Sequence, residues 1–253
     1  GNKPGEAMSD RPITISSPLY RVWAAMRLRY MEQWISSWAL PEMYTGIPGQ
    51  GAIDAWFSLR LELELKDLQG TPYCGGAADI QQLFDQVQRG IIYTTATLAG
   101  MPQNILGAYM RFAEHLQAQN SINGNIGKAH RRRCGIPHGC QLSMMFVALH
   151  MRPCIIIMNT LNKDDSQNHT LVTILVADVI LVTTGSNMLN RVGNALHDTH
   201  DDLDDTGAVV APSKGFNVTN SKRGKQCLEE TTCVHINEHI KEVEGLRYLG
   251  CHI

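Results

Sequence analysis

Residues 170–184 constrain the fold of this chain more than any other stretch. Their sequence, TLVTILVADVILVTT, is uncharged and largely apolar or β-branched except for one acid, Asp178. β-Branched residues favour strands, and the interruption at Ala177 and Asp178 predicts two short strands that meet at a tight turn. A lone carboxylate costs several kcal/mol to bury unless a cation or hydrogen bonds compensate it. The stretch therefore predicts either a hairpin that presents Asp178 to a positive partner, or a buried strand that tolerates one acid at its turn.

Length and composition fit one large domain or two small subdomains, because 43% of the 253 residues are hydrophobic. Residues 1–12 do not have the basic start and apolar segment of a secretory signal. The apolar run after Met144 is interrupted by His150, Arg152 and Pro153, so no run reaches the roughly 20 residues that span a bilayer. We therefore expect an intracellular protein with no membrane segment. The start without Met and the end just after an expected strand predict a fragment of a longer chain.

The cysteine content and the net charge limit which covalent cross-links, metals and binding partners we expect for this chain. Seven cysteines without a CxxC pair fit free thiols better than a disulfide framework. A zinc site is a distant alternative, and its ligands would be Cys227, Cys233, His235 and His239. The spacing between the first two of these residues is longer than the roughly two to four residues usual between zinc ligands. The net charge of −2 gives no general attraction to nucleic acid, although residues 131–133 (RRR) form a local basic cluster. Nucleic-acid binding would therefore depend on a groove.

Hydrophobic spacing and turn residues predict alternating helices and strands along the chain. We expect helices from Ser17–Pro18 onward, over 52–66, from Pro102, over 142–151 and from Met188 to about Gly207. We expect strands over 74–79, at an Asn123-Gly124 hairpin, over 170–184 and in the tail. This order predicts a mixed α+β domain with an antiparallel sheet and helices on one face.

Two acids stand out in these predicted strands. Asp79 and Asp178 are each the only acid in an apolar or small-residue strand, and the two strand ends can lie side by side in a mixed sheet. Paired carboxylates suit Mg²⁺, which also keeps water and substrate phosphates as ligands. Between the two acids, the glycine-rich loop 135–143 carries His138 and allows a nucleotide or a template backbone to approach closely.

Six blocks of sequence resemble the reverse transcriptase domain of non-LTR (LINE-like) retrotransposons, in the right order and over nearly the whole chain. The blocks are 11–13 (RPI) with 19–22 (LYRV); 78–85 (ADIQQLFD) as motif A; 135–143 (GIPHGCQLS) as motif B; 176–179 (VADV) as motif C; 221–222 (SK) as motif D; and 248–250 (YLG) as motif E.

The resemblance implies a right-hand polymerase fold, with mainly fingers over about 1–72, mainly palm with some fingers over about 73–253, and no thumb. It implies Mg²⁺ or Mn²⁺ held by catalytic Asp79 and Asp178 and by the backbone carbonyl of Ile80. An RNA template, a DNA primer and a dNTP would be the partners. The protein would act in a nuclear or cytoplasmic ribonucleoprotein of the retroelement.

The resemblance also implies roles in nucleotide and template binding. Phe84 would be the steric gate against the ribose 2′-hydroxyl, Arg11 would lie near the triphosphate, and Lys222 near the pyrophosphate. The loop beside the templating pair would comprise Gly135, Ile136, Pro137, His138 and Gly139. Without the resemblance, Phe84 fits a core position, and Arg11 and Lys222 fit solvated surface positions.

The sequence departs from the family pattern at several positions. Val179 replaces the second acid of motif C and Val176 its tyrosine, while His138 and Gln82 replace the usual Gln and Lys. Fewer carboxylates weaken metal binding, so we expect little or no polymerase activity, and a non-catalytic nucleic-acid-binding descendant is the alternative. Asp85, six residues beyond Asp79, is expected on a helix and directed away from the metals.

Overall fold

The computed structural model describes residues 14–161, 169–176, 178–209, 215–222, 224–225, 241–242, 247–248 and 251–252. The helices are α1 (Pro18–Tyr30), α2 (Glu32–Trp38), α3 (Ala52–Leu68), α4 (Leu83–Gln86), α5 (Arg89–Leu98), α6 (Gln103–His115), α7 (Gln141–Leu161) and α8 (Met188–Asp205). The strands are β1 (Tyr73–Asp79), β2 (Gln117–Ala118), β3 (Ser121–Ile122), β4 (Asn125–Ile126), β5 (His130–Arg131), β6 (His169–Leu175), β7 (Asp178–Thr184), β8 (Phe216–Thr219), β9 (Lys241–Glu242), β10 (Arg247–Tyr248) and β11 (Cys251–His252).

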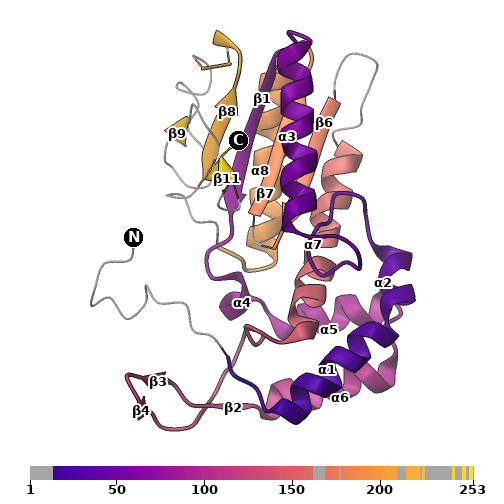
Figure 1. The fold of residues 1–253 in the computed structure, drawn as a ribbon, viewed down its shortest axis with the longest axis vertical. Helices are drawn as coiled ribbons and strands as arrows, with labels where there is room; N and C mark the ends of the chain where they lie inside the picture. The colour runs from indigo at the N-terminus through magenta and orange to yellow at the C-terminus, as the bar shows by residue number, and fades with distance from the viewer. Residues whose placement is uncertain are drawn as a thin grey trace.

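A five-stranded sheet with the order β6-β7-β1-β8-β9 forms the upper half of the molecule (Figure 1). Its pairs are antiparallel except β8–β9, which is parallel. The predicted hairpin over 170–184 is confirmed, because β6 and β7 pair from His169–Thr184 to Leu175–Asp178. The turn between them contains Val176 at φ +57°, a backbone conformation that β-branched residues rarely adopt. The predicted α+β class with an antiparallel sheet is thus confirmed.

Helices cover both faces of this sheet, whereas the sequence predicted helices on one face. Successive side chains of β7 point to opposite faces. Val179 and Leu181 belong to the main core, which includes residues of α7 and α8, while Ile180 and Val182 belong to a second cluster that includes residues of α3. Because both faces of β7 are apolar, both need a cover, and Figure 1 shows α3 and α8 on opposite sides of the sheet.

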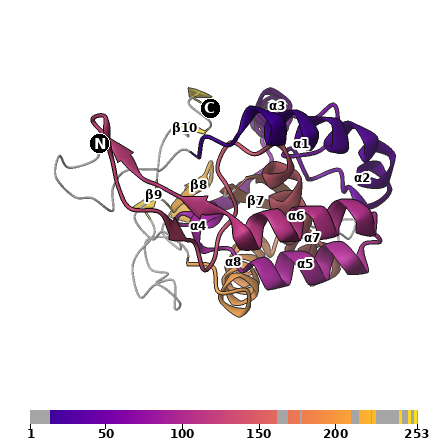
Figure 2. The same ribbon diagram turned by 90° about the horizontal axis from the view of Figure 1, so that it is seen from below.

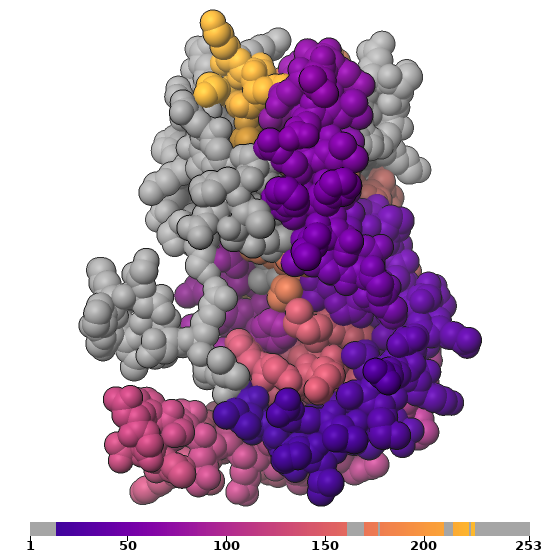
Figure 3. Space-filling view, in the orientation of Figure 1, coloured from indigo at the N-terminus to yellow at the C-terminus, as the bar shows by residue number. Residues whose placement is uncertain are grey.

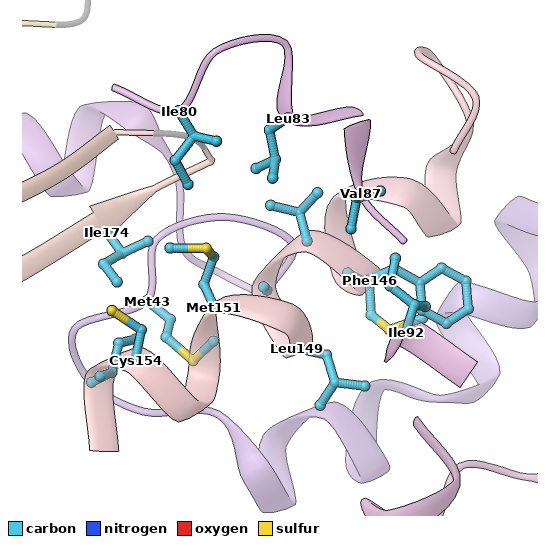
Figure 4. Close-up of a cluster of buried hydrophobic side chains, with 14 of the residues drawn as sticks. Met43, Ile80, Leu83, Val87, Ile92, Phe146, Leu149, Met151, Cys154 and Ile174 are labelled. Atoms are coloured by element: carbon cyan, nitrogen blue, oxygen red, sulfur yellow. The ribbon is translucent and has the colours of Figure 1, made fainter. Parts of the chain in front are cut away.

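Helix α7 is the centre of the main core. Figure 4 shows Phe146, Leu149, Met151 and Cys154 of this helix among apolar side chains from several other elements. The sequence predicted that the apolar run would be broken near Pro153, but the helix continues through this proline to Leu161. Residues Gln141–Thr160 are thus long and apolar enough to cross a membrane, and 67% of the most apolar window is buried inside the fold, as in a core helix.

The lower half of the molecule contains α1, α2, α5 and α6, with α5 and α6 side by side in Figure 2. The predicted helices at Pro18, 52–66, Pro102 and Met188 are confirmed, and α5 is an element that the sequence analysis did not predict. A segment between α2 and α3 joins the two halves, because Ile174 of β6 bonds to Glu42 and Tyr44 through backbone N–O distances of 3.0 and 3.2 Å.

The structure describes the predicted hairpin at Asn123-Gly124 but not the residues of the predicted zinc site. The Asn123-Gly124 hairpin is confirmed, since β3 and β4 pair across it. The proposed zinc ligands Cys227, Cys233, His235 and His239 lie outside the described residues. Among the described residues, the cysteines Cys74, Cys134, Cys140 and Cys154 are not in disulfide bonds.

Candidate active site

The two predicted carboxylates meet at one end of the sheet. Asp79 is the last residue of β1, Asp178 is the first residue of β7, and the two are direct antiparallel partners. Side chains in directly opposite positions point to the same face, with Cβ atoms about 4.5–5.5 Å apart. The sequence prediction that these two strand ends lie side by side is therefore confirmed.

Both carboxylates line a pocket of about 280 Å³. The remaining walls come from the turn after β1, from the glycine-rich loop before α7 and from the β6–β7 hairpin. The lining residues besides the two acids are Ile80, Gln82, Leu83, Phe84, Asp85, His138, Leu175 and Val176. Segments far apart in the sequence thus converge on one concave, partly polar site.

An aromatic contact forms one wall of this pocket. The ring of Phe84 lies edge-on to the ring of His138, with centroids 4.7 Å apart and planes inclined by 61°. Phe84 is only partly buried and packs against the core from the pocket side. Both predictions for Phe84, a core contact and a wall of the nucleotide site, are compatible with this position.

The glycine-rich loop is joined to the turn after β1 through backbone contacts. The amides of Gly135 and Ile136 donate to the carbonyls of Val87 and Phe84 at 2.9 and 2.7 Å. Gly135 has φ +80°, and an added Cβ would lie 2.7 Å from the carbonyl oxygens of Phe84 and Asp85. This close approach requires glycine at position 135.

The other end of the loop is held by the start of α7 and by α1. Ser143 Oγ donates to the Pro137 carbonyl at 2.9 Å. The Tyr20 hydroxyl lies 3.1 Å from Cys140 Sγ. Burial, together with Cys140, raises the pKa of Tyr20, so the phenol stays protonated and neutral. The loop is therefore fixed at both ends, with His138 between them.

Asp85 faces the pocket, so the prediction that it points elsewhere is wrong. Its Oδ1 lies 3.1 Å from Arg132 Nη1, and its Oδ2 lies 3.5 Å from His138 Nε2. The cause is local geometry: Gln82 has φ +48°, and the following helix α4 is a single turn. Sequence spacing assumed a regular helix after Asp79 and so missed the cluster of Asp85, Arg132 and His138.

Val179 lies next to Asp178 but not in the pocket. Its side chain is 0% exposed and belongs to the main core. Alternation along β7 directs Asp178 and Val179 to opposite faces of the sheet. An acid at position 179 would therefore enter an apolar environment unless the hairpin moved.

The other predicted nucleotide- and template-binding residues lie in different environments. Ile136 is fully buried and Pro137 is buried, so both support the loop from inside, while Gly139 is exposed. Lys222 is exposed after β8 and does not line the pocket. Arg11 lies outside the described residues.

The donor set fits a hard divalent cation that retains other ligands. Within the described ranges, no group of three or more His, Cys, Asp and Glu side chains is close enough to hold a metal by itself. Mg²⁺ is commonly held by one or two carboxylates together with water and substrate phosphates, and paired Asp79 and Asp178 meet that need.

Comparisons with known proteins agree with this architecture. A protein-family model described as reverse transcriptase (RNA-dependent DNA polymerase) matches residues 2–253. No curated protein matches the sequence. The fold is similar to apo telomerase from Candida tropicalis truncated from its C-terminal domain, with a TM-score of 0.60 and 14% identity over 80% of this chain and 42% of that one.

Two further telomerase structures have similar folds. Telomerase from Candida tropicalis with a TWJ fragment of telomeric RNA gives a TM-score of 0.57 at 13% identity, over 80% of this chain and 33% of that one. The Candida albicans telomerase with a TWJ fragment of telomeric RNA gives 0.51 at 16% identity, over 81% of this chain and 34% of that one. This chain thus spans less than half the length of these proteins, and at such identities the likeness concerns the fold alone. The match of the family model over residues 2–253 shows that the chain belongs to the reverse transcriptase (RNA-dependent DNA polymerase) family.

Proposed function

We propose that this chain is the RNA-directed DNA polymerase domain of a non-LTR retroelement, with activity weakened by Val179. Its reaction is attack of a primer 3′-hydroxyl on the α-phosphate of a dNTP, with release of pyrophosphate. An RNA template, a DNA primer and a dNTP are the ligands, and a nuclear or cytoplasmic ribonucleoprotein is the setting. Residues up to about 72 act mainly as fingers, and the rest mainly as palm.

The observation that carries this proposal is the direct pairing of Asp79 with Asp178 at the edge of a pocket that also contains Phe84 and His138. Asp79 and Asp178, with the backbone carbonyl of Ile80, would hold Mg²⁺ or Mn²⁺. When bound, such a cation stabilises negative charge on phosphoryl oxygens. The Phe84 ring, supported by His138, would limit the space beside the ribose 2′ position and so favour deoxynucleotides.

Primer extension on an RNA template tests the proposal. Asp79→Asn should lower the extension rate at least about 100-fold, the usual scale for loss of a charge-stabilising group in an active site. Asp54→Asn is the matched control, because Asp54 is an exposed acid at the start of α3 and is not among the residues that line the pocket. Equal rates for the wild type and Asp79→Asn would overturn the catalytic assignment.

The second candidate function is a non-catalytic nucleic-acid-binding module. The valine at position 179 favours it, because the residue beside Asp178 supplies no carboxylate and its side chain is buried in the apolar core. Wild-type protein that binds primer–template but extends no primer with either Mg²⁺ or Mn²⁺ would support this function over the first.

A further inference from the structure

A two-stranded arm, residues 117–133, projects from the lower half of the molecule. It consists of β2 paired with β5 and, further out, β3 paired with β4. Figures 1 and 2 show its outer hairpin extending away from the helices, and Figure 3 shows it as a protrusion at the lower left. Every residue from 119 to 131 is exposed. An isolated two-stranded hairpin is marginally stable in water, so such an arm is expected to gain stability from a partner.

The base of the arm is fixed to the body by Arg89, which is only 8% exposed. Its Nη1 donates to the Ala113 carbonyl before the arm, and its Nη2 donates to the Arg132 carbonyl at the end of the arm, both at 2.7 Å. Its Nε lies 3.3 Å from Glu114 Oε1, which balances the charge. One buried cation therefore joins the end of α6, which precedes the arm, to the residue that follows β5, and so fixes the two ends of the arm to each other.

The charge of the arm is of one sign. Residues 115–163 contain no Asp or Glu, although the whole chain has 24. Within this stretch the arm carries Lys128, Arg131, Arg132 and Arg133. Arg132 lies against Asp85 of the pocket, while Lys128, Arg131 and Arg133 are exposed. An acid-free, exposed set of Lys and Arg matches a polyanion, because each such side chain can neutralise one phosphate.

The position of the arm indicates which polyanion it binds. Its last residues continue directly into the glycine-rich loop, and Arg132 contacts a carboxylate that lines the pocket. Lys128 and Arg131 thus lie on the segment that leads through Arg132 to the pocket, so a phosphate backbone bound by them lies along this approach. We propose that the arm of residues 117–133 binds the phosphate backbone of the nucleic acid that enters this pocket. This inference rests on the proposed function for its ligand, but it concerns binding and not catalysis.

The test measures how affinity depends on salt. Wild type and the double variant Lys128→Gln/Arg131→Gln are titrated with labelled nucleic acid at several KCl concentrations, without nucleotide or divalent metal. The slope of log K against log salt is negative, and each lost phosphate contact makes it less steep, by about 0.9 for a duplex and about 0.7 for a single strand. The double variant should therefore lose about 1.8 with an RNA–DNA duplex if the duplex is bound, or about 1.4 with single-stranded RNA if the template alone is bound.

The matched control is Arg60→Gln/Lys66→Gln on α3, which removes the same net charge away from the arm (Figures 1 and 2). This control should keep the wild-type slope. An unchanged slope in the arm variant, or an equal loss in the α3 variant, would overturn the inference. The inference would also be overturned if Lys128 and Arg131 were needed for binding to anionic vesicles but not for binding to nucleic acid. That result would assign the arm to a membrane surface.

The salt titration and the primer-extension assay together separate this inference from the proposed polymerase function. If the wild type extends no primer but the Lys128→Gln/Arg131→Gln variant shows the predicted loss of slope, the polymerase function is refuted and the arm inference is retained. If the wild type extends primers but the arm variant has the same salt dependence of nucleic-acid binding as the wild type, only the arm inference is refuted. Wild-type protein that binds no nucleic acid at any salt concentration would refute both.

Discussion

Asp79 at the end of β1 stands directly opposite Asp178 at the start of β7. Carboxylates in opposite positions of an antiparallel pair repel each other, and a divalent cation shared between them removes that repulsion. Because the cation binds the folded state and not the unfolded state, its binding also stabilises the fold by mass action. Metal binding at this site should therefore be measurable as stability, independently of catalysis.

Mg²⁺ or Mn²⁺ is expected to raise the melting temperature of the wild type. At a free concentration ten times the Kd, the gain is about 1.4 kcal/mol, or about 3–5 °C for a domain of this size. Asp178→Asn should lose most of this shift, and the exposed-site control Asp54→Asn should keep it. Thermal unfolding with metal and with EDTA provides the measurement, and equal shifts in all three proteins would rule out metal binding at this pair.

Val179→Asp is expected to lower the free energy of unfolding by several kcal/mol, because the side chain at 179 is fully buried in the apolar core. Val179→Thr has the same shape and no charge, and should cost about 1–3 kcal/mol. Urea denaturation compares the two variants. If both have the same stability, the carboxylate has reached the pocket, and the hairpin moves to present position 179.

Gly135→Ala and Gly90→Ala are expected to have effects of opposite sign. Gly135 has φ +80° and lies against the carbonyls of Phe84 and Asp85, so alanine there should cost about 1–3 kcal/mol. Gly90 lies in α5, and an added Cβ would have nothing within 4 Å, so alanine there should add about 0.5–1 kcal/mol. Thermal unfolding of both variants tests this pair. A neutral Gly135→Ala would show that the loop can move away from the turn after β1.

The ion pair between Asp85 and Arg132 is expected to be coupled more strongly than a surface pair. Both side chains are 23% exposed. A double-mutant cycle with Asp85→Asn and Arg132→Gln should give a coupling energy of about 1 kcal/mol. The pair Arg60–Glu64 on α3, which is 39% and 52% exposed, is the control and should give about 0.3–0.5 kcal/mol. Equal coupling in the two cycles would mean that Asp85 does not hold Arg132 in place.

Much of the fold follows from local patterns in the sequence. The β-branched run on each side of Ala177 predicts the β6–β7 hairpin, Ser17 and Pro18 predict the start of α1, and Asn123-Gly124 predicts the outer hairpin of the arm. These signals are local, because strand propensity, helix starts and turn residues act over a few neighbouring positions. The two carboxylates of the site also follow from the sequence, since each is the only acid in its strand.

The sequence does not show which side of an apolar element meets the core. Val22 and Met26 continue a helical stripe in α1, yet they are 61% and 63% exposed. Ile53 and Phe57 of α3 are likewise exposed, because α3 contacts the sheet through Ala55 and Leu59. Periodicity gives the spacing of apolar residues, but their burial depends on which elements pack beside them.

The sequence by itself determined the two strand-end acids, the glycine-rich loop and the order of the elements that position them. Only the tertiary structure decided that Asp85 turns into the pocket toward Arg132, and that Val179 turns away from it into the core. The first depends on the positive φ of Gln82, and the second on the pleat of a strand that is covered on both faces. Such side-chain directions depend on backbone geometry and long-range packing, which residue spacing does not encode.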